Sequence, residues 1–348
     1  MQSAPATISP AVAAFRERVA AMRESAAYRN YERVRDRVLD MRAGVEASGE
    51  YRPSMYWREE LSRLEYMLDA SPFIVDRLRE HTFHVTGLRV YDYRSQRHRH
   101  REQLAEKLRE LQRVAPPGLL VPEWRGLGGF GFEIEGELYN LDTLKFLEVL
   151  IALEKGAVLQ EFRDSEDRRL VWEIGAGWGG FAYQFKTLCP NTTYLITDLP
   201  DLFIFSATYL TTAFPGARVC FWGEEPSDRI FARWRDYDFI FMPHTALDEL
   251  TPDRLDLAVN MVSFQEMTQQ QVTGYVARAH ALDCRLLYSL NRDRRQYNPE
   301  IESVSAIVSR FYWPHEIPVL KIPYTKFVGE SPSEKDYKHV VGWRRAQI

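Results

Sequence analysis

The stretch LVWEIGAGWGG, at Leu170–Gly180, combines a strand pattern with a glycine-rich turn. Its first residues are apolar except for one acid, Glu173, as expected of a strand buried in a parallel sheet. Four glycines follow, and glycine suits a turn that needs positive φ or lets a ligand touch the backbone. Phe181, Phe185 and Leu188 then fall on one helical face. The stretch predicts a strand, a tight turn and a helix N-terminus, which together form a nucleotide-type cradle.

The glycine spacing alone leaves the ligand open, because Gly175, Gly177 and Gly180 satisfy the G-x-G-x-x-G pattern of dinucleotide enzymes. Glu173 favours another ligand, since an acid at this strand end would repel a pyrophosphate and attract an ammonium or sulfonium. A second expected strand, YLITD, ends in Asp198, 23 residues after Gly175. A carboxylate there can accept both hydroxyls of a ribose. The combination indicates a class I S-adenosylmethionine-dependent methyltransferase rather than a nicotinamide enzyme.

The composition predicts a globular protein with one large domain or two ordinary ones, because 45% of its 348 residues are hydrophobic. A net charge of −4 argues against nucleic-acid binding driven by bulk charge. The N-terminus lacks a secretory signal pattern, and no segment reaches the apolar length of a membrane span. Three cysteines at no metal-like spacing fit reduced thiols. We therefore expect a cytoplasmic protein without a membrane partner and without a bound metal.

Three segments are expected along the chain. Residues 1–115 follow helical periodicities and predict a helical N-terminal domain with a role in substrate binding or oligomerisation. Residues 116–165 contain a tract rich in glycine and aromatic residues, interpreted either as a hinged lid or as an ordinary linker, and then a lead-in helix. Residues 166–348 form the predicted S-adenosylmethionine-binding domain.

From residue 170 onwards, strand and helix patterns alternate, which predicts an α/β, doubly wound, Rossmann-like sheet. Ile317–Tyr324 and Tyr337–Trp343 are predicted to form a closing pair that supplies an antiparallel last strand. The third core strand is left open between Arg218–Trp222 and Tyr237–Met242. At the lead-in helix, either Asn140 or Asp142 can serve as N-cap, which leaves the other without an explanation.

From about Trp124 to Arg292 the sequence resembles the bacterial sugar O-methyltransferase family in five ordered motifs. The motifs are G-G-x-G-F…Y-N-x-D-T-x-K-F (Gly128–Phe146), E-I-G-A-G-x-G-G (Glu173–Gly180), T-D-L-P (Thr197–Pro200), N-x-x-S-F-Q-E-M (Asn260–Met267) and S-x-N-R (Ser289–Arg292). The resemblance implies O-methylation of a sugar or glycosylated natural product with S-adenosylmethionine as the donor. The N-terminal third matches only loosely, and selectivity for the substrate is expected there.

The candidate site residues follow from the strand ends, where ligands bind in doubly wound sheets. Glu173 and the turn are expected to face the methionine moiety, Asp198 the ribose and Leu199 the adenine. The expected cofactor-binding residues are Glu173, Gly175, Ala176, Gly177, Trp178, Asp198, Leu199 and Ser263. The expected substrate-binding residues are Tyr139, Asn140, Gln265, Asn291 and Arg292.

Two residues are candidates for catalysis, because a sugar hydroxyl needs a general base before it attacks the sulfonium methyl group in line. Glu266 ranks first, since the resemblance implies a base after this strand, although a carboxylate there could instead stabilise a helix N-terminus. His244 has a pKa in the useful range, but it could flank the adenine or cap a turn. Arg292 could bind substrate oxygens or pair with Glu266.

Two other functions stay open on the sequence. One is N-methylation of an amino sugar or another small metabolite, which the candidate residues barely distinguish from O-methylation. The other is a binding protein that keeps the methyltransferase fold without turnover; retention of Glu173, the glycines and Asp198 argues against it. The expected partner is a small molecule, such as a sugar or glycoside, and a homodimer is left open.

Overall fold

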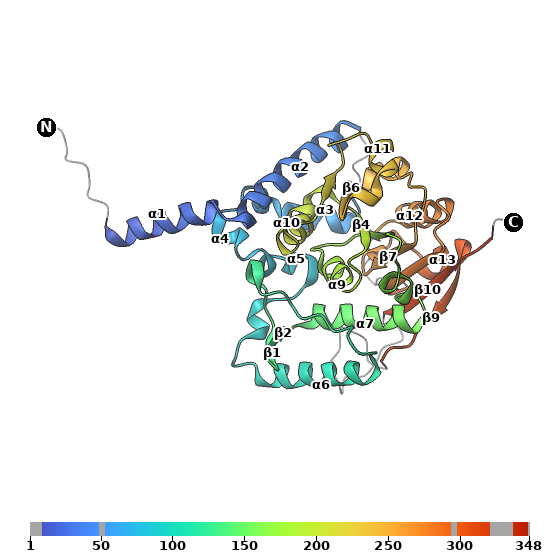
Figure 1. Cartoon of the computed structure of the whole chain (residues 1–348), viewed down its shortest axis with the longest axis horizontal. Helices are drawn as coiled ribbons and strands as arrows, with labels where there is room; N and C mark the ends of the chain where they lie inside the picture. Colours follow the sequence, from blue (N-terminus) through green and yellow to red (C-terminus); the bar gives the residue numbers. More distant parts are fainter. Residues whose placement is uncertain (1–8, 49–52, 294–297, 321–336, 347–348) are drawn as a thin grey trace.

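The computed structural model describes residues 9–48, 53–293, 298–320 and 337–346 (Figure 1). Its α-helices are α1 (Pro10–Arg23), α2 (Ala26–Ser48), α3 (Met55–Ser62), α4 (Pro72–Val75), α5 (Phe83–Thr86), α6 (His98–Val114), α7 (Leu141–Lys155), α8 (Gln160–Arg163), α9 (Gly180–Leu188), α10 (Phe203–Ala213), α11 (Ser227–Ala232), α12 (Gln269–Ala281) and α13 (Val304–Phe311). Its strands are β1 (Phe132–Ile134), β2 (Glu137–Tyr139), β3 (Arg169–Ile174), β4 (Thr192–Asp198), β5 (Val219–Phe221), β6 (Phe239–Pro243), β7 (Leu257–Met261), β8 (Leu286–Asn291), β9 (Tyr312–Glu316) and β10 (Lys338–Arg344).

The central sheet has eight strands in the order β5-β6-β4-β3-β7-β8-β10-β9. The first six are parallel to their neighbours, and β10 runs antiparallel to both β8 and β9. Every residue of β4, β6, β7 and β8 is buried, as expected when helices cover both faces of a parallel sheet. The predicted α/β, doubly wound, Rossmann-like sheet with an antiparallel last strand is therefore confirmed.

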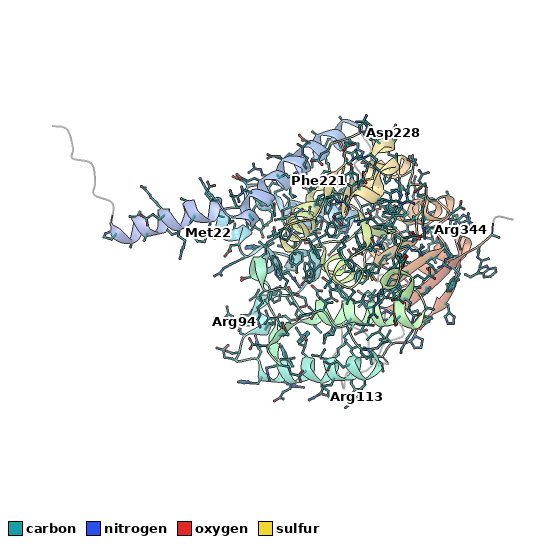
Figure 2. The ribbon with its side chains drawn as sticks, viewed as in Figure 1. Met22, Arg94, Arg113, Phe221, Asp228 and Arg344 are labelled. Carbon is teal, nitrogen blue, oxygen red and sulfur yellow. The ribbon has the colours of Figure 1, made fainter. Side chains whose placement is uncertain are left out.

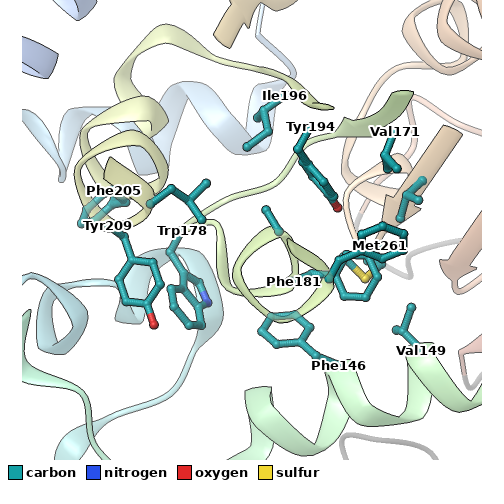
Figure 3. Packing of buried hydrophobic residues seen from close by; sticks show 14 of the residues in the cluster. Phe146, Val149, Val171, Trp178, Phe181, Tyr194, Ile196, Phe205, Tyr209 and Met261 are labelled. Atoms are coloured by element: carbon teal, nitrogen blue, oxygen red, sulfur yellow. The ribbon is translucent and has the colours of Figure 1, made fainter. Parts of the chain in front are cut away.

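Two hydrophobic cores lie on the two faces of this sheet, because successive side chains of a strand point to opposite faces. Val171 packs into the first core, which contains residues of α2, α7, α9 and α10. Figure 3 shows part of this core, including Val171, Tyr194 and Ile196 from the strands and Phe146 from α7. Trp172 packs into the second core with residues of α11, α12 and α13.

The structure settles which strand is the third core strand. Strand β6, from the Tyr237–Met242 candidate, pairs along its whole length with β4. The Arg218–Trp222 candidate forms β5, a strand of three residues that pairs with β6 at the edge of the sheet. It is therefore the accessory strand.

The closing pair differs from its prediction. Strand β10 matches the expected Tyr337–Trp343, but its partner β9 covers Tyr312–Glu316 instead of Ile317–Tyr324. The chain passes directly from α13 into β9, so the pairing with β10 starts earlier in the sequence than predicted. Ile317, the first residue of the predicted strand, extends this pairing by donating a backbone hydrogen bond to His339. Residues 321–324 of the predicted strand lie outside the described residues. Strand β9 is the other edge of the sheet and carries Pro314 in its middle.

The N-terminal helices share the first core with the sheet. Helix α2 packs against α10, and Tyr31 and Val34 of α2 are fully buried in that core. Helix α1, predicted from its apolar periodicity, forms as expected but contains no buried residue and projects from the body (Figures 1 and 2, with Met22 labelled). No helix among the described residues combines the length and apolarity needed to cross a membrane.

The glycine-rich tract of residues 116–140 is closely packed. A Cβ on Gly129 would lie 1.8 Å from the carbonyl oxygen of Trp124, and one on Gly131 would lie 2.4 Å from that of Tyr139. The tract contains the hairpin of β1 and β2. At Gly129 and Gly131, glycine therefore lets two stretches of backbone approach each other, a use of glycine that needs no hinge. Upstream, α6 covers His98–Val114 within the predicted helical region.

Candidate functional site

The glycine turn has the backbone that its sequence predicts. Gly175, Gly177 and Gly179 have φ of 72°, 58° and 84°, which are favourable only for glycine. A Cβ on Gly175 would lie 2.3 Å from the Ser263 hydroxyl, and one on Gly177 would lie 2.8 Å from a methyl group of Val85. The turn is therefore enclosed by the β7 end on one side and by the N-terminal helices on the other.

A cavity of about 260 Å³ opens at this turn, along the carboxyl ends of β3, β4, β6 and β7. Ligands of doubly wound sheets bind at this edge. The structure brings together here all the residues expected to bind the cofactor and both candidates for catalysis. They are Glu173, Gly175, Ala176, Gly177, Trp178, Asp198, Leu199, Ser263, His244 and Glu266.

Glu173 presents a buried carboxyl group to the cavity, with a side chain that is 1% exposed. Among the residues that the structure describes, neither of its oxygens has a hydrogen-bond partner, and the hydroxyl of Tyr194 has none either. Burial raises the pKa of Glu173 to about 8, and the nearby Asp198 adds to this, while Tyr194 and Lys145 oppose it. A buried carboxyl group without a partner is costly. This carboxyl group is suited to bind a cation.

Asp198 is anchored at the end of β4 by the glycine turn. Its Oδ2 accepts a hydrogen bond from the Gly177 amide at 2.9 Å, and its Oδ1 accepts one from the Leu199 amide at 2.8 Å. Burial raises the pKa of Asp198 to about 7, although these amides and that of Ala176 lower it. Each oxygen keeps a second lone pair, so the fixed carboxylate can still accept hydroxyl donors from a ligand.

His244 and Glu266 lie on opposite sides of the turn. His244 follows β6, which lies beyond β4, whereas Glu266 ends the short helix η8 (Phe264–Glu266) after β7. Burial lowers the pKa of His244 to about 4, so its imidazole is neutral at pH 7. Glu266 is partly exposed and precedes α12, whose N-cap is Thr268. The N-cap of α12 is thus supplied by Thr268 and not by Glu266.

The turn that carries Glu266 has an unusual backbone. Val262, which lines the cavity next to Ser263, has φ of 66°. A β-branched residue rarely adopts this conformation, which costs about 1–3 kcal/mol and is found most often at functional sites. The Val262 amide donates to the Leu290 carbonyl at 2.7 Å, and this hydrogen bond helps to hold the turn.

None of the five residues expected to bind substrate lines the cavity. The Gln265 side chain accepts a hydrogen bond from the Arg292 amide at 2.9 Å and donates one to the Tyr337 hydroxyl at 3.1 Å. Asn291 donates to Asn260 and Ser289, both at 2.8 Å. These side chains join the ends of β7 and β8 behind the cavity. The Gln265 and Asn291 side chains are thus engaged in hydrogen bonds within the protein, and the Arg292 guanidinium lies 4.7 Å from the centre of the Tyr337 ring.

Tyr139 and Asn140 lie at the start of α7, also outside the cavity. Tyr139 is buried in the first core. Asn140 is the N-cap of α7 in a capping box with Thr143, each side chain accepting from the other residue's amide. The N-cap role therefore belongs to Asn140, and Asp142 is the residue that this role does not explain.

Asp142 lines the cavity as part of a buried cluster of charges. Its Oδ2 accepts hydrogen bonds from the Arg79 guanidinium at 2.8 Å and the Trp178 indole at 3.2 Å, and its Oδ1 accepts one from Lys145 at 3.1 Å. Arg79, whose side chain is fully buried, also donates to Glu123 at 2.8 Å. Its guanidinium lies 3.8 Å from the centre of the Trp178 ring, a cation–π contact. The cluster joins the N-terminal helices, α7 and the glycine turn.

Several residues of the cavity wall were not predicted. Trp57, Ser54 and Val85 come from the N-terminal helices, and Lys145 and Asp142 come from α7. The sequence motif Y-N-x-D-T-x-K-F contains both Asp142 and Lys145, so it carried a signal for these two. Nothing local marks the residues of the N-terminal helices. Among the described residues, no group of three His, Cys, Asp or Glu side chains could hold a metal ion.

No protein-family model and no curated protein matches this chain. Among solved structures, WbdD is 11% identical, with a TM-score of 0.38 over 58% of this chain and 39% of that chain. EvdMO1 is 13% identical, with a TM-score of 0.37 over 69% of this chain and 47% of that one. The N-methyltransferase NodS from Bradyrhizobium japonicum WM9 is 13% identical, with a TM-score of 0.33 over 56% and 96%.

This chain thus spans less than half of the WbdD and EvdMO1 chains. Likenesses at such low identities and TM-scores say nothing about activity. The function has to be inferred from the chemistry of the cavity.

Proposed function

We propose that the protein is an S-adenosylmethionine-dependent methyltransferase. The observation that carries this proposal is the pair of buried acids on either side of the glycine turn, Glu173 and Asp198. Glu173 has no hydrogen-bond partner in the described part of the chain and fits the ammonium group of the methionine moiety, while Asp198 fits the two ribose hydroxyls. A Cβ on Gly175 or Gly177 would clash with Ser263 or Val85, which line the cavity beside the turn. A dinucleotide fits less well, because its pyrophosphate would meet Glu173.

The strand order supports one orientation of the donor. In the order β6-β4-β3-β7, His244 and Asp198 lie on one side of the glycine turn, and Ser263 and Glu266 lie on the other. With the ribose at Asp198, the adenine is directed towards Leu199 and His244. His244 is then far from the reacting methyl group and is better suited to border the adenine. Glu266 remains the candidate for the base.

We further propose that the acceptor is a hydroxyl group of a sugar or glycosylated natural product. The cofactor supplies an activated methyl group, and the protein orients the hydroxyl and removes its proton. Glu266, partly exposed in the cavity wall, can accept that proton. Trp57 offers a flat apolar surface of the kind that lines small-molecule pockets.

The cofactor assignment is tested by isothermal titration calorimetry with S-adenosylmethionine, S-adenosylhomocysteine and NAD. We expect the first two to bind and NAD not to bind. Binding of NAD alone would overturn the proposal, and binding of none of the three would leave no basis for an enzyme of either kind. The acceptor is then sought by screening hydroxylated compounds for a mass increase of one methyl group, with amino sugars as the comparison for N-methylation.

The affinity for S-adenosylmethionine is expected to rise with pH up to about pH 8. Burial raises the pKa of Glu173 to about 8 and that of Asp198 to about 7. Each carboxyl group must lose its proton before it can pair with an ammonium or accept two hydroxyl donors. Binding at pH 7 therefore releases protons, which calorimetry in buffers of different ionisation enthalpy measures.

Stability of the ligand-free protein is expected to change in the opposite direction. A raised pKa means that the folded state retains protons that the unfolded chain loses, so these two groups stabilise least above pH 8.

The control for the binding prediction is Glu173→Gln, which should reduce the proton release and flatten the affinity profile. If the variant releases as many protons as the wild type, Glu173 is not the group that titrates.

Glu266→Gln is expected to bind S-adenosylmethionine normally and to lower kcat by about 10²–10⁴-fold, as expected for loss of a general base. Binding is measured by calorimetry and turnover by methyl transfer to the acceptor found in the screen. Glu266→Asp is the matched variant, because it keeps the carboxylate on a shorter side chain and should recover part of the rate. Equal turnover of the Gln variant and the wild type would exclude Glu266 as the base.

A further inference from the structure

Lys145 is the single Lys or Arg among the described residues that line the cavity. It lies on α7, outside the glycine turn and the strand ends, and its side chain is 13% exposed. The other ionisable groups of the wall, apart from His244 and Tyr275, are acids: Asp142, Glu173, Asp198 and Glu266. The cavity is therefore predominantly acidic, with one localised positive charge.

This charge distribution limits how a zwitterionic ligand can lie. The methionine moiety of S-adenosylmethionine carries an ammonium and a carboxylate on the same carbon atom. Lys145 is the one Lys or Arg among the described wall residues that can pair with the carboxylate, which the ionised acids of the wall repel. Both groups are attached to one carbon atom. The acidic side chain that binds the ammonium and the cationic side chain that binds the carboxylate must therefore lie near each other. Glu173 and Lys145 can serve together because both line the same cavity, and the positive charge of Lys145 acts to lower the pKa of Glu173.

The direction of Lys145 is set by Asp142. One oxygen of Asp142 accepts from Lys145 at 3.1 Å, and the other accepts from Arg79 at 2.8 Å and Trp178 at 3.2 Å. The second oxygen is thus fixed by groups that are themselves buried, with Arg79 also bound to Glu123. Asp142 in turn holds the ammonium of Lys145 at the cavity wall. Asp142 is a positioning residue for Lys145.

We infer that Lys145, held in place by Asp142, binds the α-carboxylate of the methyl donor. This inference rests on the proposed function and extends it, because it predicts which nucleosides the protein rejects. Charge-assisted hydrogen bonds are about twice as strong as neutral ones, so the contact provides selectivity for donors with a complete amino-acid tail. Nucleosides that lack the carboxylate lose this contact and keep those to Asp198.

The experiment compares two ligands that differ only in this carboxylate, S-adenosylmethionine and its decarboxylated form, by calorimetry. Wild-type protein should bind the complete donor about 10–100-fold more tightly, the range expected for a hydrogen bond between charged groups. Lys145→Met should lose this preference by weakening the binding of S-adenosylmethionine alone. Lys145→Arg, which keeps the charge, should restore most of it.

The outcomes separate this inference from the proposed function. If Lys145→Met weakens both ligands equally, or neither, Lys145 does not bind the carboxylate, although the donor site itself stands. If wild-type protein binds neither ligand, the proposed function fails first. 5′-Methylthioadenosine, which lacks the whole amino-acid tail, is the control for the fold of the variant. Its affinity should be the same for Lys145→Met and the wild type, and a loss there would also count against the inference.

Discussion

Asp198→Ala is expected to weaken S-adenosylmethionine binding by about 100-fold or more. The carboxylate is fixed by the Gly177 and Leu199 amides at 2.9 and 2.8 Å and faces the cavity. A hydrogen bond to a charged group contributes about 1.5–3 kcal/mol, and the ribose offers two hydroxyls, so the loss of both exceeds two decades in affinity. The measurement is a calorimetric titration of the purified variant with the donor.

Asp201→Asn is the matched control for this prediction. Asp201 lies three residues further on and is also buried, but its carboxylate pairs with Arg42 at 3.2 Å and does not line the cavity. Its affinity for the donor should equal that of the wild type. Asp198→Asn should be intermediate, because the amide keeps one acceptor oxygen. Wild-type affinity in Asp198→Ala would contradict the ribose contact, and an equal loss in Asp201→Asn would show that the effect is general.

Arg79→Met is expected to lower the free energy of unfolding by about 3–5 kcal/mol, the usual cost of removing one member of a buried ion pair. Its guanidinium pairs with Glu123 and Asp142, both at 2.8 Å, and all three side chains are buried. Methionine keeps much of the volume but removes the cation paired with Glu123 and leaves Asp142 paired with Lys145 alone. The measurement is urea unfolding, followed by the shift of the transition midpoint.

Arg77→Met provides the comparison two residues away. The Arg77 side chain is 66% exposed, and its nearest acid is Glu80 at 4.0 Å, so we expect a change within about 0.5 kcal/mol. A double variant of Arg79→Met with Glu123→Gln should lose less stability than the sum of the two single changes, because one unpaired charge disappears. Additive losses would show that Arg79 does not act through its pairing with Glu123.

Much of the fold could be predicted from the sequence because its determinants are local. The decisive features lie within 29 residues, Leu170–Asp198. They are the apolar run of β3, the glycines after it and the acid that ends β4, and each of them indicates one local structure. Gly175 shows this directly, since its φ of 72° and its contact with Ser263 exclude a side chain. The sequence could not decide whether β5 or β6 is the third core strand, because both have similar compositions. The strand pairing decides it, since β6 pairs with β4 and β5 pairs with β6.

Long-range packing decides which of the strand-end residues line the cavity. Gln265 and Asn291 lie near strand ends, where site residues are expected. Their side chains form hydrogen bonds within the protein instead. Asn291 accepts from the Gln265 amide and donates to Asn260, and Gln265 accepts from the Arg292 amide. A strand end fixes where a residue lies, but the following turn fixes where its side chain points, and Val262 shows how unusual that turn is. Trp57 reaches the cavity from a helix more than a hundred residues upstream of the glycine turn, which no local pattern reveals.

The two edges of the central sheet bear on how copies of this protein can associate. One edge is β5, with only three residues, and the other is β9, where Pro314 removes a hydrogen-bond donor from the middle of the strand. Short strands and prolines are common devices against strand-to-strand aggregation, because an incoming strand finds few free donors and acceptors. Strand addition at either edge is thereby disfavoured. A homodimer of this protein would have to form through other surfaces.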